Sequence, residues 1–376
     1  MKSDKTTPNV PTLRFPNYNG EWQKTVMGKV CSFRKGYGIA KDDLSSGGTP
    51  CILYGELYTT YKTAIAKTIK SKTSIQSKSL VYSQKDDVII PCSGETAEDI
   101  ATSICVPYDG VLLGGDLTVV HSDLDGAFLS NQINSVRKYD IARIAQGKSI
   151  VHLQADELKK IFIFYPSIQE QRKISAFIDK IDERIEIQNK IISKYETLIK
   201  GLCDMIFRHN KSVSLSDLVK CKTSALQENT VSTCHRGEYK VLGASGAIAA
   251  IDTYQFEESG ILVLKDGSKA GKIQFAQGKY SVVGTSVVLI PNEACDARYL
   301  YFAMSSIDFE KYKVGSGIPH IYFKDYSNER IYYPEKALRK KIIKTLDFYE
   351  TRVEIEREML SAMQKQKAFL LQSMFI

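Results

Sequence analysis

The segment Ile163-Phe164-Tyr165-Pro166 returns as Ile331-Tyr332-Tyr333-Pro334, 168 residues further along the chain. The same offset, without a gap, pairs identical residues on both sides of this segment: Gly147 with Gly315, His152 with His320, Ile174 with Ile342, Asp179 with Asp347, and Phe207 with Phe375. A repeat of this length indicates two copies of one structural unit. The chain is therefore predicted to run head, helix, head, helix.

A heptad pattern follows the proline of each copy. Apolar residues alternate at spacings of four and three, and the polar interruptions Gln188 and Glu356 fall at equivalent places. Such a seam is typical of a coiled coil. The two seams most simply bury each other, and a homodimer or partner contact through the same stripe is the alternative. The predicted seam residues are Ile174, Ile178, Ile181, Ile185, Ile192, Ile199, Ile342, Leu346, Val353, Leu360, Met363 and Leu370.

Short β-rich runs cut by turn residues fill the rest of each copy. Examples are Asp87–Pro91, Leu117–Val120, Ile261–Leu264 and Ser286–Ile290. The predicted fold class is α+β, with two β-rich domains separated by two long helices. The predicted boundaries are 1–167 and 208–334 for the heads, and 168–207 and 335–376 for the helices.

Composition excludes several protein classes. Of 376 residues, 43% are hydrophobic and 25% are charged, which is close to globular averages and unlike a disordered or fibrous chain. The apolar runs are far shorter than the roughly 20 residues of a membrane span, and the N-terminus lacks a secretory pattern. The eight cysteines lack zinc-ligand spacing. We expect a cytoplasmic protein with reduced thiols and no metal site.

Catalytic motifs are mostly missing. Gly267-Ser-Lys-Ala-Gly271-Lys272-Ile273 resembles a phosphate loop, but three residues separate the glycines, and Ile273 stands where Ser or Thr should bind Mg²⁺. A β-hairpin turn explains it better. His152 and His320 are repeat-equivalent, which favours hydrogen-bonded structural histidines over a general base.

A cluster of lysines without nearby acids is the charge pattern that bears on function. Residues 57–85 hold six lysines, ten Ser or Thr, three Tyr and no acid. Lysine and hydroxyl donors are the groups that contact phosphate. An ordinary solvated basic face is the alternative, and the net charge of +8 is mild. The DNA-binding candidates are Lys62, Lys67, Lys70, Lys72 and Lys78 in the first copy and Lys265, Lys269, Lys272 and Lys279 in the second.

Several motifs, in order, resemble the specificity subunits of type I restriction-modification systems. They are Leu13-Arg-Phe-Pro…Trp22, Pro166-Ser-Ile-Gln-Glu-Gln-Arg-Lys-Ile174, Tyr239-Lys-Val-Leu-Gly-Ala-Ser-Gly-Ala-Ile248 and Gly315-Ser-Gly-Ile-Pro-His-Ile321. Ser245, within the third motif, joins the DNA-binding candidates. The resemblance covers essentially the whole chain. The second helix start, Pro334–Ile342, departs from it by lacking the Glu-Gln pair, and Gly147–His152 lacks the fuller glycine signature.

The resemblance implies a non-catalytic DNA-recognition subunit. Each head would read one half of a bipartite, asymmetric site. The helices would form an antiparallel coiled coil that spaces the heads around a pseudo-two-fold axis and docks two modification methyltransferase subunits. Motor-endonuclease subunits would join for restriction. S-adenosylmethionine and ATP with Mg²⁺ would be bound by those partners, and this chain would bind no cofactor.

Two other functions compete with DNA recognition. One is a non-catalytic coiled-coil scaffold that recruits protein partners through its heads. The other is a nuclease or hydrolase, which needs a metal-binding carboxylate cluster. Glu95, Glu98 and Asp99 form the compact candidate, and capping or solvating a turn explains them better.

Overall fold

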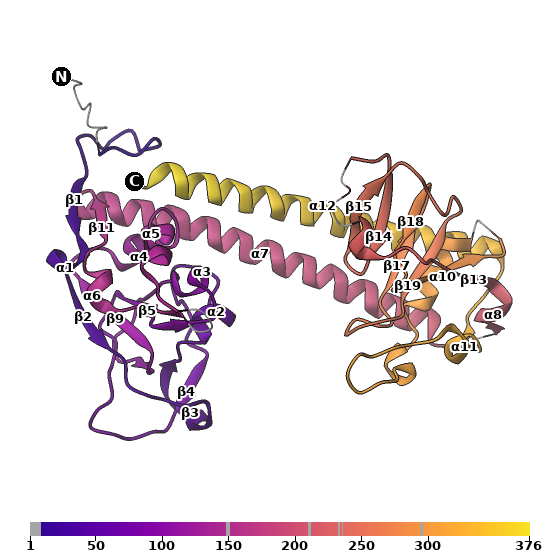
Figure 1. Ribbon diagram of the computed structural model, residues 1–376, viewed down its shortest axis with the longest axis horizontal. Coiled ribbons are helices and arrows are strands. Elements are labelled where there is room, and N and C mark those ends of the chain that lie inside the picture. The colour runs from indigo at the N-terminus through magenta and orange to yellow at the C-terminus, as the bar shows by residue number, and fades with distance from the viewer. Residues whose placement is uncertain (1–8, 148–150, 210–211, 232–233, 235, 294–295) are drawn as a thin grey trace. The chain divides into compact units, whose positions relative to one another are not determined.

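The computed structural model describes residues 9–147, 151–209, 212–231, 234, 236–293 and 296–376, so His235 and Cys295 lie outside the described residues. The chain divides into two compact units. Unit 1 comprises Met1–Asn189 with Met359–Ile376, and unit 2 comprises Lys190–Glu358. Each unit contains one β-rich head and parts of two long helices (Figure 1). Within the described residues, no helix is long and apolar enough to cross a membrane.

The first head is built from short strands and short helices. In chain order these are β1 (Gln23–Val26), α1 (Met27–Val30), β2 (Cys31–Lys35), η1 (Lys41–Asp43), β3 (Leu44–Ile52), α2 (Glu56–Thr59), β4 (Ser71–Thr73), β5 (Asp87–Pro91), β6 (Ser93–Gly94), α3 (Ala97–Ile100), β7 (Ile104–Val106), β8 (Leu112–Leu113), β9 (Leu117–Ser122), α4 (Gly126–Asn134), α5 (Lys138–Ile144), β10 (Val151–His152), α6 (Ala155–Leu158) and β11 (Phe162–Tyr165).

Two sheets form the centre of the first head. One has the order β2-β9-β5-β7 and is antiparallel throughout. The other has the order β4-β3-β8, in which β3 is antiparallel to β4 and parallel to β8. Side chains of β5 alternate between two cores: Val88 and Ile90 pack in the core that includes Leu129 of α4, and Ile89 packs with Ile52 of β3. Burial on both faces explains the continuous apolar run of β5.

The second head repeats these elements. They are β12 (Val213–Ser214), α8 (Leu215–Leu218), β13 (Val219–Thr223), α9 (Glu228–Val231), β14 (Tyr239–Gly243), β15 (Gly246–Ile251), β16 (Gly260–Leu264), β17 (Ile273–Ala276), β18 (Tyr280–Val282), β19 (Ser286–Pro291), α10 (Ala297–Met304), η3 (Phe309–Tyr312), α11 (Phe323–Tyr326) and β20 (Arg330–Ile331).

The two heads share one strand topology. The four-stranded sheet of the second head has the order β13-β19-β16-β17. In both four-stranded sheets, the strand that comes first in the chain lies beside the last, the last beside the second, and the second beside the third. Its three-stranded sheet, β15-β14-β18, again combines an antiparallel with a parallel pair. The short helices α6 (Ala155–Leu158) and α11 (Phe323–Tyr326) lie at the 168-residue offset. The predicted internal repeat is therefore a repeat of structure.

Two long helices, α7 (Ile168–Phe207) and α12 (Lys336–Met374), follow the heads. In unit 1, Ile174 and Ile178 near the start of α7 pack with Leu370 and Met374 near the end of α12. In unit 2, the end of α7 packs with the start of α12 in a core that includes Cys203, Phe207, Ile342 and Leu346. The start of each helix thus meets the end of the other, so the helices are antiparallel. The predicted fold class is confirmed.

Equivalent phenylalanines close both cores. Phe207, at the end of α7, packs against Tyr299 of the second head with ring centroids 5.7 Å apart. Phe375, after the end of α12, packs against Phe128 and Trp22 of the first head at 5.1 and 6.5 Å. Each long helix therefore begins beside one head and ends in the core of the other head's unit. All twelve predicted seam residues are buried or half-buried.

Candidate nucleic-acid interface

A basic surface lies around strands β3 and β4 of the first head. Lys72 is on β4, where it pairs with Pro50 of β3, and Lys70 and Lys78 flank this strand. All three lysines are exposed. Nearby, the hydroxyl of Ser45 on β3 lies 3.1 Å from that of Ser74, the residue after β4. Lysines and hydroxyls are thus concentrated on the surface around this antiparallel strand pair.

Two acids of this region, Asp43 and Glu56, are engaged by donors of the fold, whereas Asp42 is exposed. The Glu56 carboxylate accepts hydrogen bonds from the Leu53 amide and the Ser71 hydroxyl, both at 2.7 Å. Asp43 accepts the Ala40 amide at 2.7 Å, which caps a turn of 3₁₀ helix. Because these carboxylates already accept hydrogen bonds from nearby groups, they are less available to face a ligand than the exposed lysines are. The surface around Lys70, Lys72 and Lys78 is therefore the strongest phosphate-contact candidate in the first head.

Lys67 has a different role from the one the sequence suggests. Its ammonium pairs with Asp179 at 2.6 Å and Glu183 at 2.9 Å on α7. Desolvation alone would lower the pKa of Lys67, but hydrogen bonds to these carboxylates outweigh it and raise the pKa. The pKa of Glu183 falls to about 2, because Lys180 and then Lys67 donate hydrogen bonds to it. Lys67 thus ties the first head to α7, and its charge is neutralised there.

Lys62 is exposed but also has a local partner. Its ammonium donates a hydrogen bond to the Tyr58 carbonyl at 2.9 Å, four residues earlier. Such a bond closes the turn after α2 and leaves the ammonium at the surface. The five lysine candidates of this head therefore differ in their surroundings. Lys70, Lys72 and Lys78 lie around β4, Lys62 closes a turn, and Lys67 forms ion pairs with α7.

In the second head, the tip of the β14–β15 hairpin carries Ser245. This residue is exposed in the turn between Gly243 and Gly246. The Lys272 ammonium donates to the Ala244 carbonyl at 3.2 Å, and the Gln274 amide donates to the Gly243 carbonyl at 2.9 Å. Two polar side chains from β17 and the residue before it therefore hold this hairpin tip in place.

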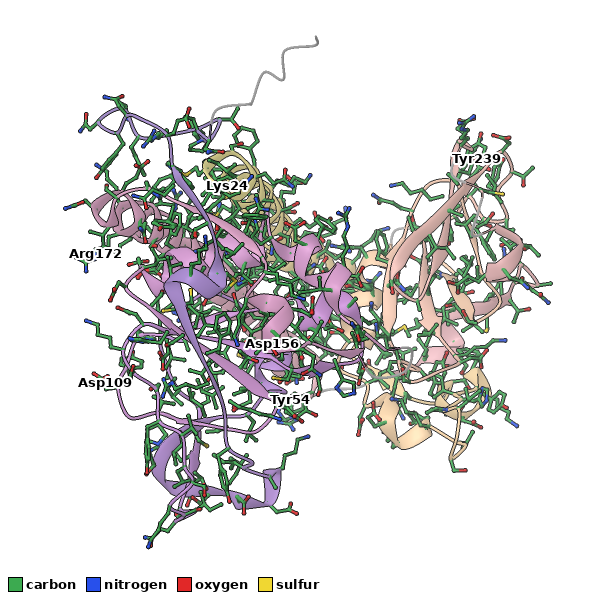
Figure 2. All side chains as sticks on the ribbon, turned by 60° about the vertical axis from the view of Figure 1, so that its left-hand side comes forward. Lys24, Tyr54, Asp109, Asp156, Arg172 and Tyr239 are labelled. Atoms are coloured by element: carbon green, nitrogen blue, oxygen red, sulfur yellow. The ribbon has the colours of Figure 1, made fainter. Side chains whose placement is uncertain are left out.

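Lys279 lies beside two tyrosines at the rim of the same head. Its ammonium lies 4.7 Å from the ring centroid of Tyr254 and 5.8 Å from that of Tyr239. The two rings meet edge to face at 5.1 Å. Figure 2 labels Tyr239, which projects from the start of β14. A cation held over aromatic faces keeps its charge while its stem is ordered.

Lys265 and Lys269 belong to the turn that resembles a phosphate loop. The strands β16 and β17 on either side of it are antiparallel, so the predicted hairpin is confirmed. Gly271 has a φ of +90°, and a Cβ there would lie 2.5 Å from Cβ of Phe309. Close packing against η3 therefore explains this glycine. Lys269 is exposed and Lys265 is half-buried.

A groove of about 1080 Å³ lies in unit 2 between the second head and the long helices. Its walls include Lys240, Lys272 and Arg298, with carboxylates of Asp347 and Glu350 opposite. Arg298 pairs with both acids, and its guanidinium packs 4.8 Å from the Phe275 ring. Asp347 is the repeat equivalent of Asp179, so each head is fastened to the helix that follows it at the same helical position.

The structure reveals a cluster of Arg34 and His121 around a buried carboxylate that sequence reasoning missed. The Asp87 carboxylate, which is fully buried, contacts the Arg34 guanidinium and lies 2.8 Å from Nδ1 of His121. It also accepts the Gln84 amide at 2.8 Å. Arg34 and His121 are each more than one-third exposed, on the adjacent strands β2 and β9. The only sequence signal was an acid opening the apolar run of β5.

The acidic nuclease candidate is a helix cap. Thr96 caps α3, because its hydroxyl oxygen accepts the Asp99 amide at 3.1 Å and its hydroxyl donates to the Asp99 carboxylate at 2.7 Å. Within the described part of the chain, no group of three or more His, Cys, Asp or Glu is arranged to hold a metal ion.

Comparison with known proteins identifies the family. The pattern of a family described as "Type I restriction modification DNA specificity domain" matches residues 19–197 and 208–364. The two matches together span most of the chain and follow its two copies. The chain belongs to this family. The predicted family membership is thereby confirmed.

Two kinds of relative accompany the family match. The "Type I restriction enzyme MjaVIII specificity subunit" of Methanocaldococcus jannaschii is 27% identical over 122 residues, which are 31% of this chain and 28% of that protein. The aligned part thus spans less than one-third of that relative's length.

Solved structures of the same family share the fold. The S subunit of a Type-I restriction-modification system from M. genitalium has a TM-score of 0.62 at 17% identity and covers 98% of this chain and 99% of its own. A second structure, from work on complex assembly and conformational transition of the type I R-M system, has a TM-score of 0.56 at 15% identity and covers 93% and 96%. At these identities the likeness concerns the fold alone.

Proposed function

We propose that this chain is the DNA-recognition subunit of a type I restriction-modification enzyme and that each head reads one half of a bipartite, asymmetric site. The observation that carries the proposal is a repeated scaffold with unlike surfaces. Both heads have the same strand order, but the first exposes Lys70, Lys72 and Lys78 around β3 and β4, whereas the second exposes Ser245 and Lys279. Two related but differently surfaced heads suit two different half-sites.

Affinity and specificity would come from different side chains. Exposed lysines supply sequence-independent contacts with phosphates, and they make binding dependent on salt. Polar groups on short turns, such as Ser245 at the β14–β15 tip, are suited to reach base edges in a groove. Because Lys67 is neutralised by α7, it has no part in this proposal.

The long helices would dock two modification methyltransferase subunits and set the spacing of the half-sites. A helix of 40 residues, such as α7, is about 60 Å long, or roughly 18 base pairs of duplex. An antiparallel pair built from a repeat presents related surfaces to two identical partners. Catalysis, S-adenosylmethionine, ATP and Mg²⁺ would belong to the methyltransferase and motor-endonuclease subunits. The enzyme would act in the cytoplasm.

Methylation mapping tests the proposal. The chain is produced with its cognate methyltransferase, and methylated positions are mapped in the DNA of the producing cells. We expect one interrupted, asymmetric motif. The complete complex should prefer a duplex with this motif over a scrambled duplex, and its affinity should fall steeply with salt. Equal affinity for both duplexes would contradict DNA recognition and favour a protein-recruiting scaffold.

A further inference from the structure

His152 and His320 occupy the same backbone position in the two heads. His152 exchanges two backbone hydrogen bonds with Gln146, at 2.9 and 2.7 Å, and His320 exchanges the same two with Val314, at 2.9 and 2.8 Å. The next residue also repeats its contact. Leu153 donates to the Cys92 carbonyl at 3.0 Å, and Ile321 to that of Lys265 at 2.9 Å. Both histidines therefore lie beside the end of the central strand, β5 or β16.

The imidazoles are not part of either core. His152 is exposed, and the side chain of His320 is 39% exposed. The repeated backbone bonds do not involve the ring, so any residue could make them. Both rings have a polar partner, as expected of hydrogen-bonded histidines, although neither ring is buried. Because both heads have a histidine ring at this surface position and the backbone bonds do not need it, a contact with a molecule outside the chain would explain the ring.

One ring nitrogen is held by the head in each case. Nδ1 of His152 lies 3.3 Å from the Ser93 hydroxyl, and Nδ1 of His320 lies 2.8 Å from the Asp266 carboxylate. Ser93 and Asp266 are equivalent, since each follows the residue that pairs with Leu153 or Ile321. With Nδ1 engaged, Nε2 is the nitrogen available to a ligand.

The neighbours of the two rings differ. His152 lines a pocket of about 440 Å³ together with Lys35, Cys92 and Asp116. At the equivalent places beside His320 stand Lys265 instead of Cys92 and Thr285 instead of Asp116, because the Lys265 amide bonds Thr285 as the Cys92 amide bonds Asp116. The histidine is thus constant, and its surroundings vary from head to head.

We propose that His152 and His320 each contact a phosphate of the DNA backbone through Nε2, an inference that rests on the proposed DNA-recognition function. Two different half-sites have different bases but the same sugar-phosphate backbone. A DNA contact that is common to both heads is therefore expected to be a contact with the backbone. A residue that reads bases would be expected to differ between the heads. The constant histidine at an otherwise variable site therefore matches a sequence-independent contact.

The partners of Nδ1 give the two contacts different proton requirements. An ionised Asp266 can only accept, so His320 must donate from Nδ1, and its Nε2 can donate to phosphate only when the ring is protonated. Ser93 can donate to Nδ1 of His152, which leaves a neutral ring able to donate from Nε2. Charged residues on the segments around His320 include Lys265, Lys269 and Lys272 in the turn after β16, Lys313 beside Val314, and Lys324 and Asp325 on α11. Lys313 is paired with Glu310.

Alanine variants at both histidines test the inference in the complete complex with the cognate methyltransferase. Binding is measured on a duplex with the mapped motif and on a scrambled duplex of the same composition, across a salt series. We expect His152→Ala and His320→Ala each to weaken binding to both duplexes roughly tenfold, with an unchanged ratio between them. His320→Ala should also flatten the salt slope by about 0.9. His209→Ala, at an exposed histidine after α7, is the matched control.

Glutamine variants give a second readout. Because a glutamine side chain can still donate a hydrogen bond, His152→Gln and His320→Gln should each recover part of the affinity that the alanine variant loses. The glutamine variants also serve if an alanine variant lowers the melting temperature. Unchanged affinity, or an altered preference at single base positions, would overturn the inference. If wild-type complex shows no preference for its motif, the proposed function fails instead.

Discussion

Gln171 and Arg339, which are 168 residues apart, make the same contact at the start of the two long helices. The Gln171 amide donates a hydrogen bond to the Pro166 carbonyl at 2.9 Å, and the Arg339 guanidinium donates one to the Pro334 carbonyl at 2.7 Å. In both copies the side chain reaches back five residues to the proline before the helix. The second copy thus keeps this helix start although it lacks the Glu-Gln pair.

The same two side chains also hold the residue at the N-cap position of a helix in the preceding head. Gln171 accepts the Asp125 amide at 3.0 Å, before α4. Arg339 pairs with the Asp296 carboxylate, before α10, at 2.9 and 3.2 Å. A neutral hydrogen bond in unit 1 is therefore replaced by a buried ion pair in unit 2. This difference leads to a prediction about the stability of each unit.

We predict that Arg339→Ala destabilises unit 2 by about 3–5 kcal/mol, because it leaves the buried Asp296 carboxylate without its cation. Gln171→Ala, the matched control in unit 1, removes neutral hydrogen bonds and should cost about 1 kcal/mol. Scanning calorimetry of the full chain measures both. Similar small losses for the two variants would contradict a buried ion pair at Arg339.

The features of the fold that could be predicted from the sequence are those that produce a local periodic pattern of apolar residues. The alternating seam of Ile174 to Leu370 predicted both helices, and the run Asp87–Pro91 coincides with β5, because these patterns are set by burial within one element. The contacts of Lys67 with Asp179 and of Arg34 with Asp87 join residues 112 and 53 positions apart, and no periodicity encodes them. The ion pairs of Lys67 with α7 were therefore not predicted.

Acid should loosen the clamp between Lys67 and α7. The folded-state pKa of Glu183, about 2, lies below its ordinary value of 4.5, so this carboxylate contributes stability above about pH 4.5 that is lost as the pH falls toward 2. We predict that amides near Lys67 lose hydrogen-exchange protection between about pH 4.5 and pH 2, after correction for intrinsic rates. Lys67→Met should reduce this pH dependence, whereas the part due to Lys180 should remain. Equal acid sensitivity in the variant would show that the clamp is not its cause.

Charge reversal separates the lysines at β4 from the clamp. Lys70→Glu with Lys72→Glu should weaken DNA binding by the complete complex and reduce its salt slope by about 2, since each phosphate contact contributes about 0.9. The matched control, Lys70→Arg with Lys72→Arg, keeps both charges and should bind as the wild type does. A filter-binding or fluorescence titration across a salt series measures the slopes. Tolerance of the reversal would favour the protein-recruiting scaffold.

The length of the long helices should set the gap in the recognised site. The Lys367 ammonium pairs with Asp182, so the segment after Lys180 in α7 faces the segment around Lys367 in α12. We predict that one heptad inserted at both places keeps the seam in register and adds about 10 Å, or roughly 3 base pairs, between half-sites that are themselves unchanged. Methylation mapping reads the gap directly. The same heptad in α7 alone is the control, and it should disrupt packing against α12 because it shifts only one side of the seam. A gap that stays constant in the doubly extended protein would assign the spacing to something other than these helices.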